Sequence, residues 1–283
     1  MVSEQLQKKI DRAVKLLQSV ANGYDGEIEV DYSGGKDSDV ILQLAKESGI
    51  RYRAIYKNTT IDPPGTLKHV RDMGAEVIRP KQSFFDVIAE AGFPNRFKRF
   101  CCKKLKEYKV LDKAIMGVRK AESVKRAARY SEPTECRYYG AKKPENHVEA
   151  IYPILDWTDE DVREFIIDRN IQLAPVYYDA DGSLHTERRL GCMCCPMAYY
   201  KSRIEQFRQH PNMVKAYCRA GEKFRQTHPD AKQTQKYSSV YEWFVRDVFF
   251  EKQDKWESFS AVGLFEEEFD YKAFIEQQFN ITL

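Results

Sequence analysis

The sequence predicts an α/β protein with a doubly wound, mostly parallel sheet and a helical C-terminal region. Three observations predict this fold. In the N-terminal half, short segments of alternating apolar residues are followed by segments in which apolar residues recur at helical spacing. A glycine-rich turn joins the first expected strand to a helix, and from about Pro196 the pattern is helical and aromatic, without clear strands. Because parallel strands need long crossover connections, strands that alternate with helices indicate a parallel sheet.

The expected elements follow one another from the N-terminus. An opening helix ends near Asn22-Gly23, and its apolar face consists of Leu6, Ile10, Val14, Leu17 and Val20. Strands are expected at residues 28–32, 51–56, 76–78 and 114–118. Helices are expected after the glycine-rich turn, at residues 66–73, and after an N-cap at Thr158 or Asp159. We therefore expect a nucleotide-binding domain over residues 1–195 and a helical region over residues 196–283.

The composition limits the class of protein. The chain has 283 residues, of which 42% are hydrophobic, so it can bury a core in one large or two small domains. No apolar stretch approaches the ~18 residues of a membrane span, and no apolar leader opens the chain. We therefore expect a cytoplasmic protein with no membrane partner. In a reducing compartment, its seven cysteines are expected to be metal ligands or reactive thiols rather than disulfides.

A glycine-rich loop stands between the first expected strand and its helix. Its residues are Ser33, Gly34, Gly35, Lys36, Asp37 and Ser38. Paired glycines let backbone amides approach an anion closely, the serines add hydroxyl donors, and the N-terminus of the next helix favours negative charge. The loop lacks the spacing of the Walker A motif and of the dinucleotide-binding fingerprint. It predicts a site for the phosphates of a nucleotide, and the alternative is an ordinary turn between strand and helix.

Two cysteine pairs lie far apart in the sequence. The first is Cys101-Cys102, and the second is formed by Cys192 and Cys195 in C-x-x-C spacing. Four thiolates from two segments suit a 4Fe-4S cluster or a tetrahedral zinc site. Adjacent cysteines are unusual in a compact zinc site, which favours the cluster. Zinc and the absence of a metal stay open as alternatives.

Basic residues are concentrated in two segments. Residues 96–109 contain seven Lys or Arg and one Glu, and residues 119–129 contain five Lys or Arg. Each segment could face a polyanion such as DNA or another nucleic acid. The alternative is a pair of solvated helix faces, and the net charge of +3 excludes neither interpretation.

Five motifs occur in an order that resembles the phosphoadenosine phosphosulfate (PAPS) reductase family, within the PP-loop ATP pyrophosphatase superfamily. They are the S-G-G-x-D-S loop, the Cys-Cys pair beside basic residues, a G-x-R-x-x-E-S-x-x-R stretch from Gly117 to Arg126, a Y-P-I-x-D-W-x-x-x-D-V stretch from Tyr152 to Val162, and G-C-x-x-C-P from Gly191 to Pro196. The resemblance covers roughly residues 25–200. It implies an adenine nucleotide alpha hydrolase-like fold, cleavage of ATP between its α and β phosphates, and four cluster ligands, Cys101, Cys102, Cys192 and Cys195.

The chain departs from the sulfonucleotide reductases of this family in two ways. Those enzymes use a thiolate of a C-terminal E-C-G-I/L-H motif, whereas the last cysteine here is Cys218. They have also usually lost the complete phosphate loop, which this chain keeps. Both departures favour ATP-dependent adenylylation over reduction. The loop, the cysteines and the Asn-Thr-x-Ile-Asp-Pro-Pro segment are similar to the DndC/SspD-type sulfur-transfer proteins of DNA phosphorothioation.

This resemblance implies an enzyme that uses ATP and Mg²⁺ to adenylylate an acceptor, a nucleic-acid phosphate, for iron-sulfur-assisted sulfur transfer. Lys36 would neutralise the leaving pyrophosphate, Asp37 would position Mg²⁺, and Arg119 and Arg126 would hold phosphate. A cysteine desulfurase and other subunits of a modification complex are the implied partners. The alternatives are an adenylyl-sulfate or PAPS reductase that releases sulfite, and a non-catalytic subunit that binds nucleotide or cluster.

The three other cysteines have no assigned role at this stage. Cys194 would be an extra thiol near the cluster. Cys136 and Cys218 are isolated in the sequence, and each is expected to be a buried or incidental cysteine.

Overall fold

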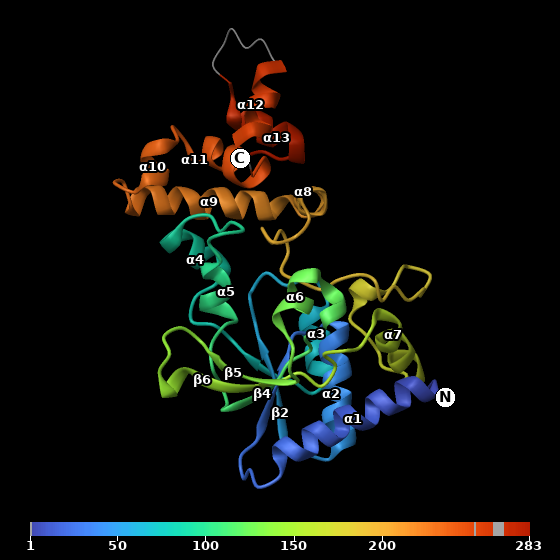
Figure 1. Ribbon diagram of the computed structural model, residues 1–283. Coiled ribbons are helices and arrows are strands. Elements are labelled where there is room, and N and C mark those ends of the chain that lie inside the picture. The colour runs from blue at the N-terminus through green and yellow to red at the C-terminus, as the bar shows by residue number, and fades with distance from the viewer. Residues whose placement is uncertain (1, 252, 263–268) are drawn as a thin grey trace. The chain divides into compact units, whose positions relative to one another are not determined.

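The computed structural model describes residues 2–251, 253–262 and 269–283 of the chain (Figure 1). The chain forms two compact units. The first unit consists of Met1–Asn58, Asp62–Arg79 and Glu107–Gly191, and the second of Thr59–Ile61, Pro80–Lys106 and Cys192–Leu283. The second unit thus contains both cysteine-bearing segments as well as the helical region expected from residue 196 onward.

Among the described residues, six strands of the first unit form one sheet in the order β3-β2-β1-β4-β6-β5. The strands are β1 (Ile28–Tyr32), β2 (Tyr52–Lys57), β3 (Glu76–Ile78), β4 (Lys113–Ile115), β5 (Thr134–Tyr138) and β6 (His147–Ile151). All neighbours run parallel except β5 and β6, which are antiparallel. The strand order reverses between β1 and β4, and ligands of doubly wound sheets bind at such a point, outside the carboxyl ends of the strands.

Helices alternate with strands in the first unit, and its α-helices were expected from the sequence except for the one at Val124–Arg129 (Figure 1). They are α1 (Glu4–Ala21), α2 (Lys36–Ser48), α3 (Thr66–Asp72), α6 (Val124–Arg129) and α7 (Asp159–Asp168), with short turns η1 (Lys120–Glu122), η2 (Pro144–Asn146) and η3 (Pro175–Tyr177). Helix α2 packs against α1 and α7. Trp157 lies in this core with its ring centroid 5.4 Å from that of Phe165. The predicted α/β class with a mostly parallel sheet is therefore confirmed.

The observed strands differ from the expected ones in two ways, at the end of β4 and at the pair β5 and β6. Strand β4 ends at Ile115 rather than at Val118, because the backbone N–H of Val118 donates to the carbonyl of Met116 at 2.9 Å and the chain turns out of the sheet there. The pair β5 and β6 was not expected from the sequence. Strand β5 has no buried residue, so it carries little of the apolar alternation that predicts a strand.

The second unit is helical over its described residues, which was expected for residues 196–283 but not for residues 80–106. Its elements are α4 (Phe84–Ala91), α5 (Phe100–Leu105), α8 (Tyr200–Gln209), α9 (Pro211–Thr227), α10 (Lys232–Lys236), α11 (Val240–Trp243), the π-helical η4 (Phe244–Phe249), α12 (Gln253–Val262) and α13 (Tyr271–Phe279). Aromatic side chains fill its core, and the ring centroids of Phe93 and Trp243 lie 4.2 Å apart. Helix α9 packs on α4 through this core.

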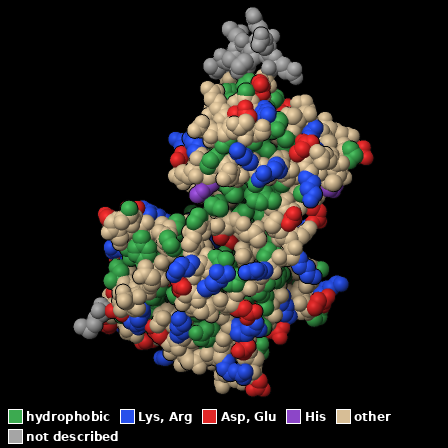
Figure 2. Space-filling view, turned by 180° about the vertical axis from the view of Figure 1, so that it is seen from behind, with side chains coloured by type: hydrophobic (Ala, Val, Ile, Leu, Met, Phe, Trp, Pro, Cys, Tyr) green, Lys and Arg blue, Asp and Glu red, His purple; other side chains and the backbone are tan. Residues whose placement is uncertain are grey.

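Two features of the structure concern the expectations of a nucleic-acid partner and of no membrane partner, namely the distribution of surface charge and the apolarity of the helices. Figure 2 shows one face of the molecule, on which Lys and Arg side chains lie in several groups beside acidic and hydrophobic side chains. Within the described residues, no helix has the length and apolarity that crossing a membrane requires.

The start of α7 gives a test of what stabilises the first unit. Thr158 is its N-cap, and the carboxylate of Asp161 accepts hydrogen bonds from the backbone N–H and the hydroxyl of Thr158 and from Lys9. Burial alone would raise the pKa of Asp161, but these three donors hold it below its ordinary value of 3.8. A depressed carboxyl pKa stabilises the fold above the unfolded pKa, and this stability is lost as pH falls through the folded pKa.

We therefore expect Asp161→Asn to lower the free energy of unfolding at pH 7 by about 1–2 kcal/mol. The difference from the parent chain should shrink as the pH is lowered below 3.8, the ordinary pKa of the residue. Denaturant titrations at several pH values measure this. Glu160→Gln, on the same helical turn but exposed, is the control and should change stability by less than about 0.5 kcal/mol. A pH-independent loss for Asp161→Asn would contradict the ion-pair account.

Candidate functional site

The glycine-rich loop follows β1 and leads directly into the 13-residue helix α2, at the carboxyl edge of the sheet. Gly34 has a φ of +74°, a conformation that favours glycine. A side chain there would also lie 3.2 Å from Val70 and 3.4 Å from Leu190 and Thr66. Because the loop is packed from both sides, its backbone has a fixed shape at the positive end of a helix.

Hydroxyl groups hold the loop from within and from a distant segment. Ser38 Oγ donates to the carbonyl of Gly35 at 2.7 Å. The hydroxyl of Tyr177 accepts hydrogen bonds from the backbone N–H groups of Lys36 at 3.0 Å and Leu190 at 3.3 Å. Burial raises the pKa of Tyr177 to about 12, so its hydroxyl stays protonated at neutral pH. Tyr177 thus fixes both the first residue of α2 and the segment that packs over Gly34.

A network of charged side chains, in which Lys36 and Arg119 are buried, continues from the loop. Lys36 Nζ lies 3.1 Å from Asp37 Oδ2, and Arg119 Nε lies 2.6 Å from Asp37 Oδ1. The other end of the same guanidinium contacts Asp159 Oδ1 at 2.8 Å. Arg119 is only 1% exposed, so it serves these two carboxylates rather than pointing outward as a free phosphate clamp. The lysine, the aspartate and the arginine of the predicted site are therefore in one network.

A close backbone contact explains how β4 reaches the loop. A Cβ atom at Gly117 would lie 3.0 Å from the carbonyl oxygen of Asp37 and 3.1 Å from its carbonyl carbon. Such contacts are tighter than most Cβ atoms make, so the backbone of Asp37 would have to shift by a few tenths of an ångström to accept a side chain. Glycine at this position therefore lets the segment after β4, which carries Arg119, run directly beside the start of α2.

Arg126 lies farther out, on α6, where two guanidinium groups share one carboxylate. Arg126 and Arg189 both pair with Glu122, the latter at 3.3 Å. Burial and the charge of Arg189 lower the pKa of Arg126 below its ordinary value. Since one carboxylate faces two cations, a further anion such as a phosphate would be electrostatically favoured here.

The sequence did not indicate a buried polar group beneath the loop. Asp39 on α2 is fully buried, and its carboxylate contacts His69 Nε2 at 3.0 Å and the hydroxyl of Tyr32. Burial raises the pKa of Asp39, and the hydrogen bonds with His69 and Tyr32 oppose this shift. The one available signal was an acidic residue on the otherwise apolar face of α2. These three side chains tie β1, α2 and α3 together behind the loop.

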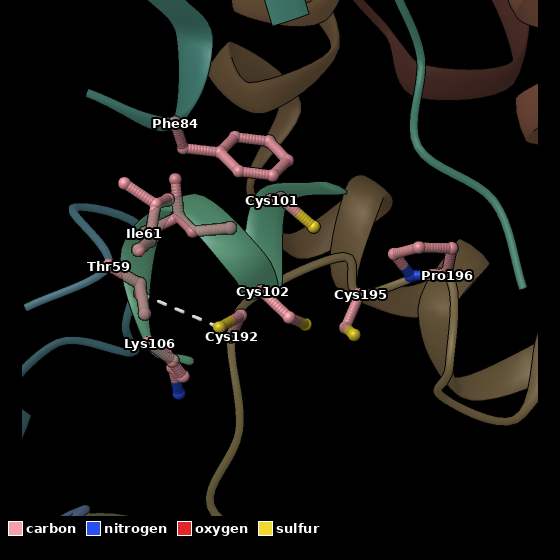
Figure 3. Close-up of a pocket in the computed structure, with 10 residues that line it drawn as sticks. Thr59, Ile61, Phe84, Cys101, Cys102, Lys106, Cys192, Cys195 and Pro196 are labelled. Atoms are coloured by element: carbon pink, nitrogen blue, oxygen red, sulfur yellow. Dashed lines mark hydrogen bonds between the residues drawn. The ribbon is translucent and has the colours of Figure 1, made fainter. Parts of the chain in front are cut away.

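The second unit brings all four predicted metal-ligating cysteines to one pocket (Figure 3). Cys101 and Cys102 lie on α5, and Cys192 and Cys195 come from the segment before α8. Figure 3 shows the sulfur atoms of Cys101, Cys102 and Cys195 in one region of the pocket, whereas the sulfur of Cys192 points toward Thr59. The other side chains that line the pocket are largely apolar. The cavity has a volume of about 30 Å³. The pairing of two distant segments, predicted from spacing, is therefore present in the fold.

Hydrogen bonds from side chains and from the backbone fix the C-x-x-C segment. Cys192 Sγ donates to Thr59 Oγ1 at 3.5 Å (Figure 3), and the N–H of Met193 donates to the carbonyl of Ile61 at 2.8 Å. Cys194 has a φ of +55°, and its N–H donates to Gln206 Oε1 at 2.7 Å. The left-handed turn at Cys194 buries that side chain among the aromatic core while its neighbours stay at the pocket.

One thiol of the pocket, that of Cys101, is a poor anion in the absence of a cation. A hydrogen bond with Cys102, together with burial, raises the pKa of Cys101. Burial likewise raises the pKa of Cys194 to about 12 and that of Cys218, in the core of the second unit, to about 12. Thiolates bind metals, so a bound cation would have to offset this cost. Cys136 lies apart on β5 and is exposed.

The arrangement of the four thiols suits a cluster better than a single metal ion. Among the described residues, no three or more His, Cys, Asp or Glu side chains are grouped closely enough to hold one metal ion. The four thiols instead line a shared pocket. A set of four cysteines with apolar neighbours is the chemistry that an iron-sulfur cluster uses, so the residues present fit that group.

Tyr177 offers a test of the loop's support. Tyr177→Phe leaves the buried N–H groups of Lys36 and Leu190 without their acceptor, so we expect the free energy of unfolding to fall by about 2 kcal/mol. ATP should also bind more weakly, because the start of α2 is no longer fixed. Tyr52→Phe on β2 is the matched control and should lie within about 0.5 kcal/mol of the parent chain. Equal stability of the two variants in a denaturant titration would contradict the role of Tyr177.

Comparisons with known proteins agree with this description. The model of the phosphoadenosine phosphosulfate reductase domain family matches residues 27–198. An uncharacterised protein of Methanocaldococcus jannaschii is 27% identical over 209 residues, which are 69% of this chain and 47% of that protein. The chain thus spans about half the length of this curated relative.

Two solved structures are similar at a greater distance. The phosphoadenylyl-sulfate reductase of Candida auris, in a phosphate complex, is 13% identical with a TM-score of 0.43, over 62% of this chain and 90% of that one. The U34-tRNA thiolase NcsA of Methanococcus maripaludis, with its 4Fe-4S cluster, is 15% identical with a TM-score of 0.43, over 80% of each chain.

Proposed function

The chain belongs to the phosphoadenosine phosphosulfate reductase domain family, and from that premise we propose that it is a PP-loop ATP pyrophosphatase coupled to sulfur transfer. The proposed acceptor is a nucleic-acid phosphate, as in the DndC/SspD-type proteins that the sequence resembles. The observation that carries the proposal is the complete S-G-G-K-D-S loop at the N-terminus of α2, with Lys36 and Asp37 held in one buried network with Arg119.

The chemistry of the first step follows from this network. An acceptor oxygen attacks the α-phosphorus of ATP, a new P–O–P bond forms, and the bond to the β-phosphate breaks to release pyrophosphate. Negative charge grows on the leaving group, where Lys36 and the N-terminus of α2 would stabilise it. Asp37 would position Mg²⁺ on the same oxygens. Arg119 acts as a positioning residue, because it contacts both Asp37 and Asp159.

A second step would complete the transfer. A sulfide ion attacks the activated phosphorus, the phosphorothioate forms, and AMP leaves with the bridging oxygen. A persulfide donor would first have to be reduced by two electrons from a thiol reductant to supply that sulfide. Arg126, which shares Glu122 with Arg189, is proposed to hold an acceptor phosphate during these steps. The sulfur would come from a partner such as a cysteine desulfurase, within a larger modification complex.

The cysteine pocket is proposed to bind a 4Fe-4S cluster through Cys101, Cys102, Cys192 and Cys195, with zinc as the alternative metal. When bound, such a cluster can carry or activate sulfur through its iron atoms. The chain's own contribution is to bring the two cysteine segments together in an apolar pocket that limits access of water.

One experiment separates this proposal from sulfonucleotide reduction, which family membership keeps as the alternative. The anaerobically purified chain is incubated with ATP, Mg²⁺, sulfide and a DNA or RNA oligonucleotide, and digested products are searched by mass spectrometry for phosphorothioate linkages. A parallel reaction supplies adenylyl sulfate and a thiol donor. Phosphorothioate formation that requires ATP supports the proposal, and sulfite release without ATP would replace it with the reductase reaction.

A further inference from the structure

A short turn just before the Cys101-Cys102 pair presents an aromatic side chain to solvent. Asn95 Oδ1 accepts hydrogen bonds from the backbone N–H groups of Phe97 at 2.9 Å and Lys98 at 2.8 Å, and the N–H of Asn95 donates to the carbonyl of Lys98 at 3.3 Å. These bonds fix the turn with Phe97 at its apex. Phe97 is 97% exposed, so the fold orders this ring without burying it.

Further exposed apolar side chains lie beside the second cysteine segment. Met197 is 45% and Tyr199 is 69% exposed. Arg96 Nη2 donates to the carbonyl of Ala198 at 2.8 Å, so the turn around Phe97 and the residues after Cys195 are tied together within the second unit. We call residues 95–99 with 197–199 the turn surface. It adjoins in sequence both pairs of cysteines that line the pocket.

The positive charge around the turn surface indicates which kind of ligand it fits. Residues 95–106 contain six Lys or Arg and no Asp or Glu. Lys98 and Lys103 are exposed, whereas Lys104 pairs with Glu90 at 2.5 Å. Protein interfaces are depleted in lysine at their centres, whereas grooves for single strands combine basic side chains with aromatic rings on which bases stack. Arg96 lies 3.6 Å from Glu251, so the exposed lysines are the cations on which the choice of ligand rests. An exposed ring beside the exposed Lys98 and Lys103 favours a nucleic acid over a protein.

We propose that the turn surface binds single-stranded nucleic acid, with an unpaired base stacked on Phe97 and backbone phosphates contacted by the basic residues that flank it. Tyr199 would offer a second ring. This inference rests on the proposed function for the reason to bind a nucleic acid, and it deepens that function by naming the form of the acceptor. A single-stranded nucleic acid bound here would lie beside the two segments whose cysteines line the pocket.

The test is the affinity of the full chain for fluorescein-labelled oligothymidylate, oligouridylate and a DNA duplex, measured by fluorescence anisotropy without ATP. Phe97→Ala should weaken binding to the single strands by about five-fold to a hundred-fold, since loss of one stacked base has this effect. Phe97→Trp should bind as the parent chain does. Ile167→Ala, which truncates a 55% exposed residue on α7, is the matched control and should leave binding unchanged.

A second variant separates stacking from charge. Lys98→Ala should reduce the dependence of the affinity on salt, because each contacted phosphate contributes about −0.7 to the slope for single strands, while Phe97→Ala should leave that slope unchanged. The preference between the two single strands identifies DNA or RNA as the ligand. Tight duplex binding that does not depend on Phe97, or no binding to any oligonucleotide, would overturn the proposal and leave a protein as the partner.

These outcomes are independent of ATP cleavage. If single strands bind in a way that depends on Phe97 but the chain forms no AMP, the proposed function is rejected. The proposal that the turn surface binds single-stranded nucleic acid then still holds. If the chain forms AMP and pyrophosphate but Phe97→Ala does not change its affinity for single strands, the proposed binding role of the turn surface is rejected. The proposed ATP cleavage is then supported.

Discussion

Replacing Lys36 by alanine is expected to reduce formation of AMP and pyrophosphate from ATP at least about a hundred-fold, because it would remove the charge that we propose stabilises the developing pyrophosphate. Lys36 is buried, and its amino group lies 3.1 Å from Asp37 Oδ2 at the start of α2. A nucleotide phosphate would enter this ion pair and share the lysine. The loss should therefore fall mainly on turnover, measured as release of both products with Mg²⁺ under anaerobic conditions.

The matched control is Lys46→Ala, which removes an exposed lysine from the last turn of the same helix. It should leave turnover close to that of the parent chain. Thermal unfolding of both variants shows whether the loop still folds, since removal of Lys36 also leaves Asp37 to Arg119 alone. Equal turnover in a folded Lys36→Ala variant and the control would contradict the role of the loop in ATP cleavage.

Replacing a cysteine of the pocket is expected to remove the bound metal. Cys101→Ser and Cys195→Ser each take one donor from the set of four, and a partial thiolate set holds a cluster poorly. We expect anaerobically purified parent protein to be brown and to contain iron, and both variants to lose the colour and the iron. Visible absorption and elemental analysis measure this without any assay of activity.

Cys136→Ser is the control for this series, because Cys136 is exposed on β5 in the first unit. It should retain the full iron content. Stoichiometric zinc in the parent chain, lost in the two pocket variants, would assign the same residues to the alternative metal. Iron that is unchanged in Cys101→Ser and Cys195→Ser would contradict the assignment of the pocket.

Much of the first unit could be predicted because local sequence determines it. The alternation at 28–32, the paired glycines and the helical spacing after them lie within twenty residues, and β1, the loop and α2 form where expected. The N-cap of α7 is Thr158, one of the two residues expected. Strand β5 could not be found in this way, because it carries no buried residue and is a strand only through its pairing with β6. Strand β6 does carry the alternation, since Val148 and Ala150 are buried on either side of Glu149, but it was not among the strands expected.

The site itself could be predicted only in part, because sequence indicates residue types but not their partners. The loop and the four pocket cysteines are recognisable from spacing. The burial of Arg119 between Asp37 and Asp159 depends on contacts across 82 and 40 residues of chain, which no local pattern reveals. The same holds for Tyr177, whose hydroxyl reaches Lys36 across 141 residues.

The most direct test of the central claim is the identity of the products formed from ATP labelled at the α-phosphate, in the presence of Mg²⁺ and a single-stranded oligonucleotide. Cleavage at the glycine-rich loop predicts labelled AMP and an equal amount of unlabelled pyrophosphate, both dependent on Lys36. Labelled ADP with free phosphate, or no cleavage of ATP by a metal-loaded chain that releases sulfite from adenylyl sulfate, would contradict it.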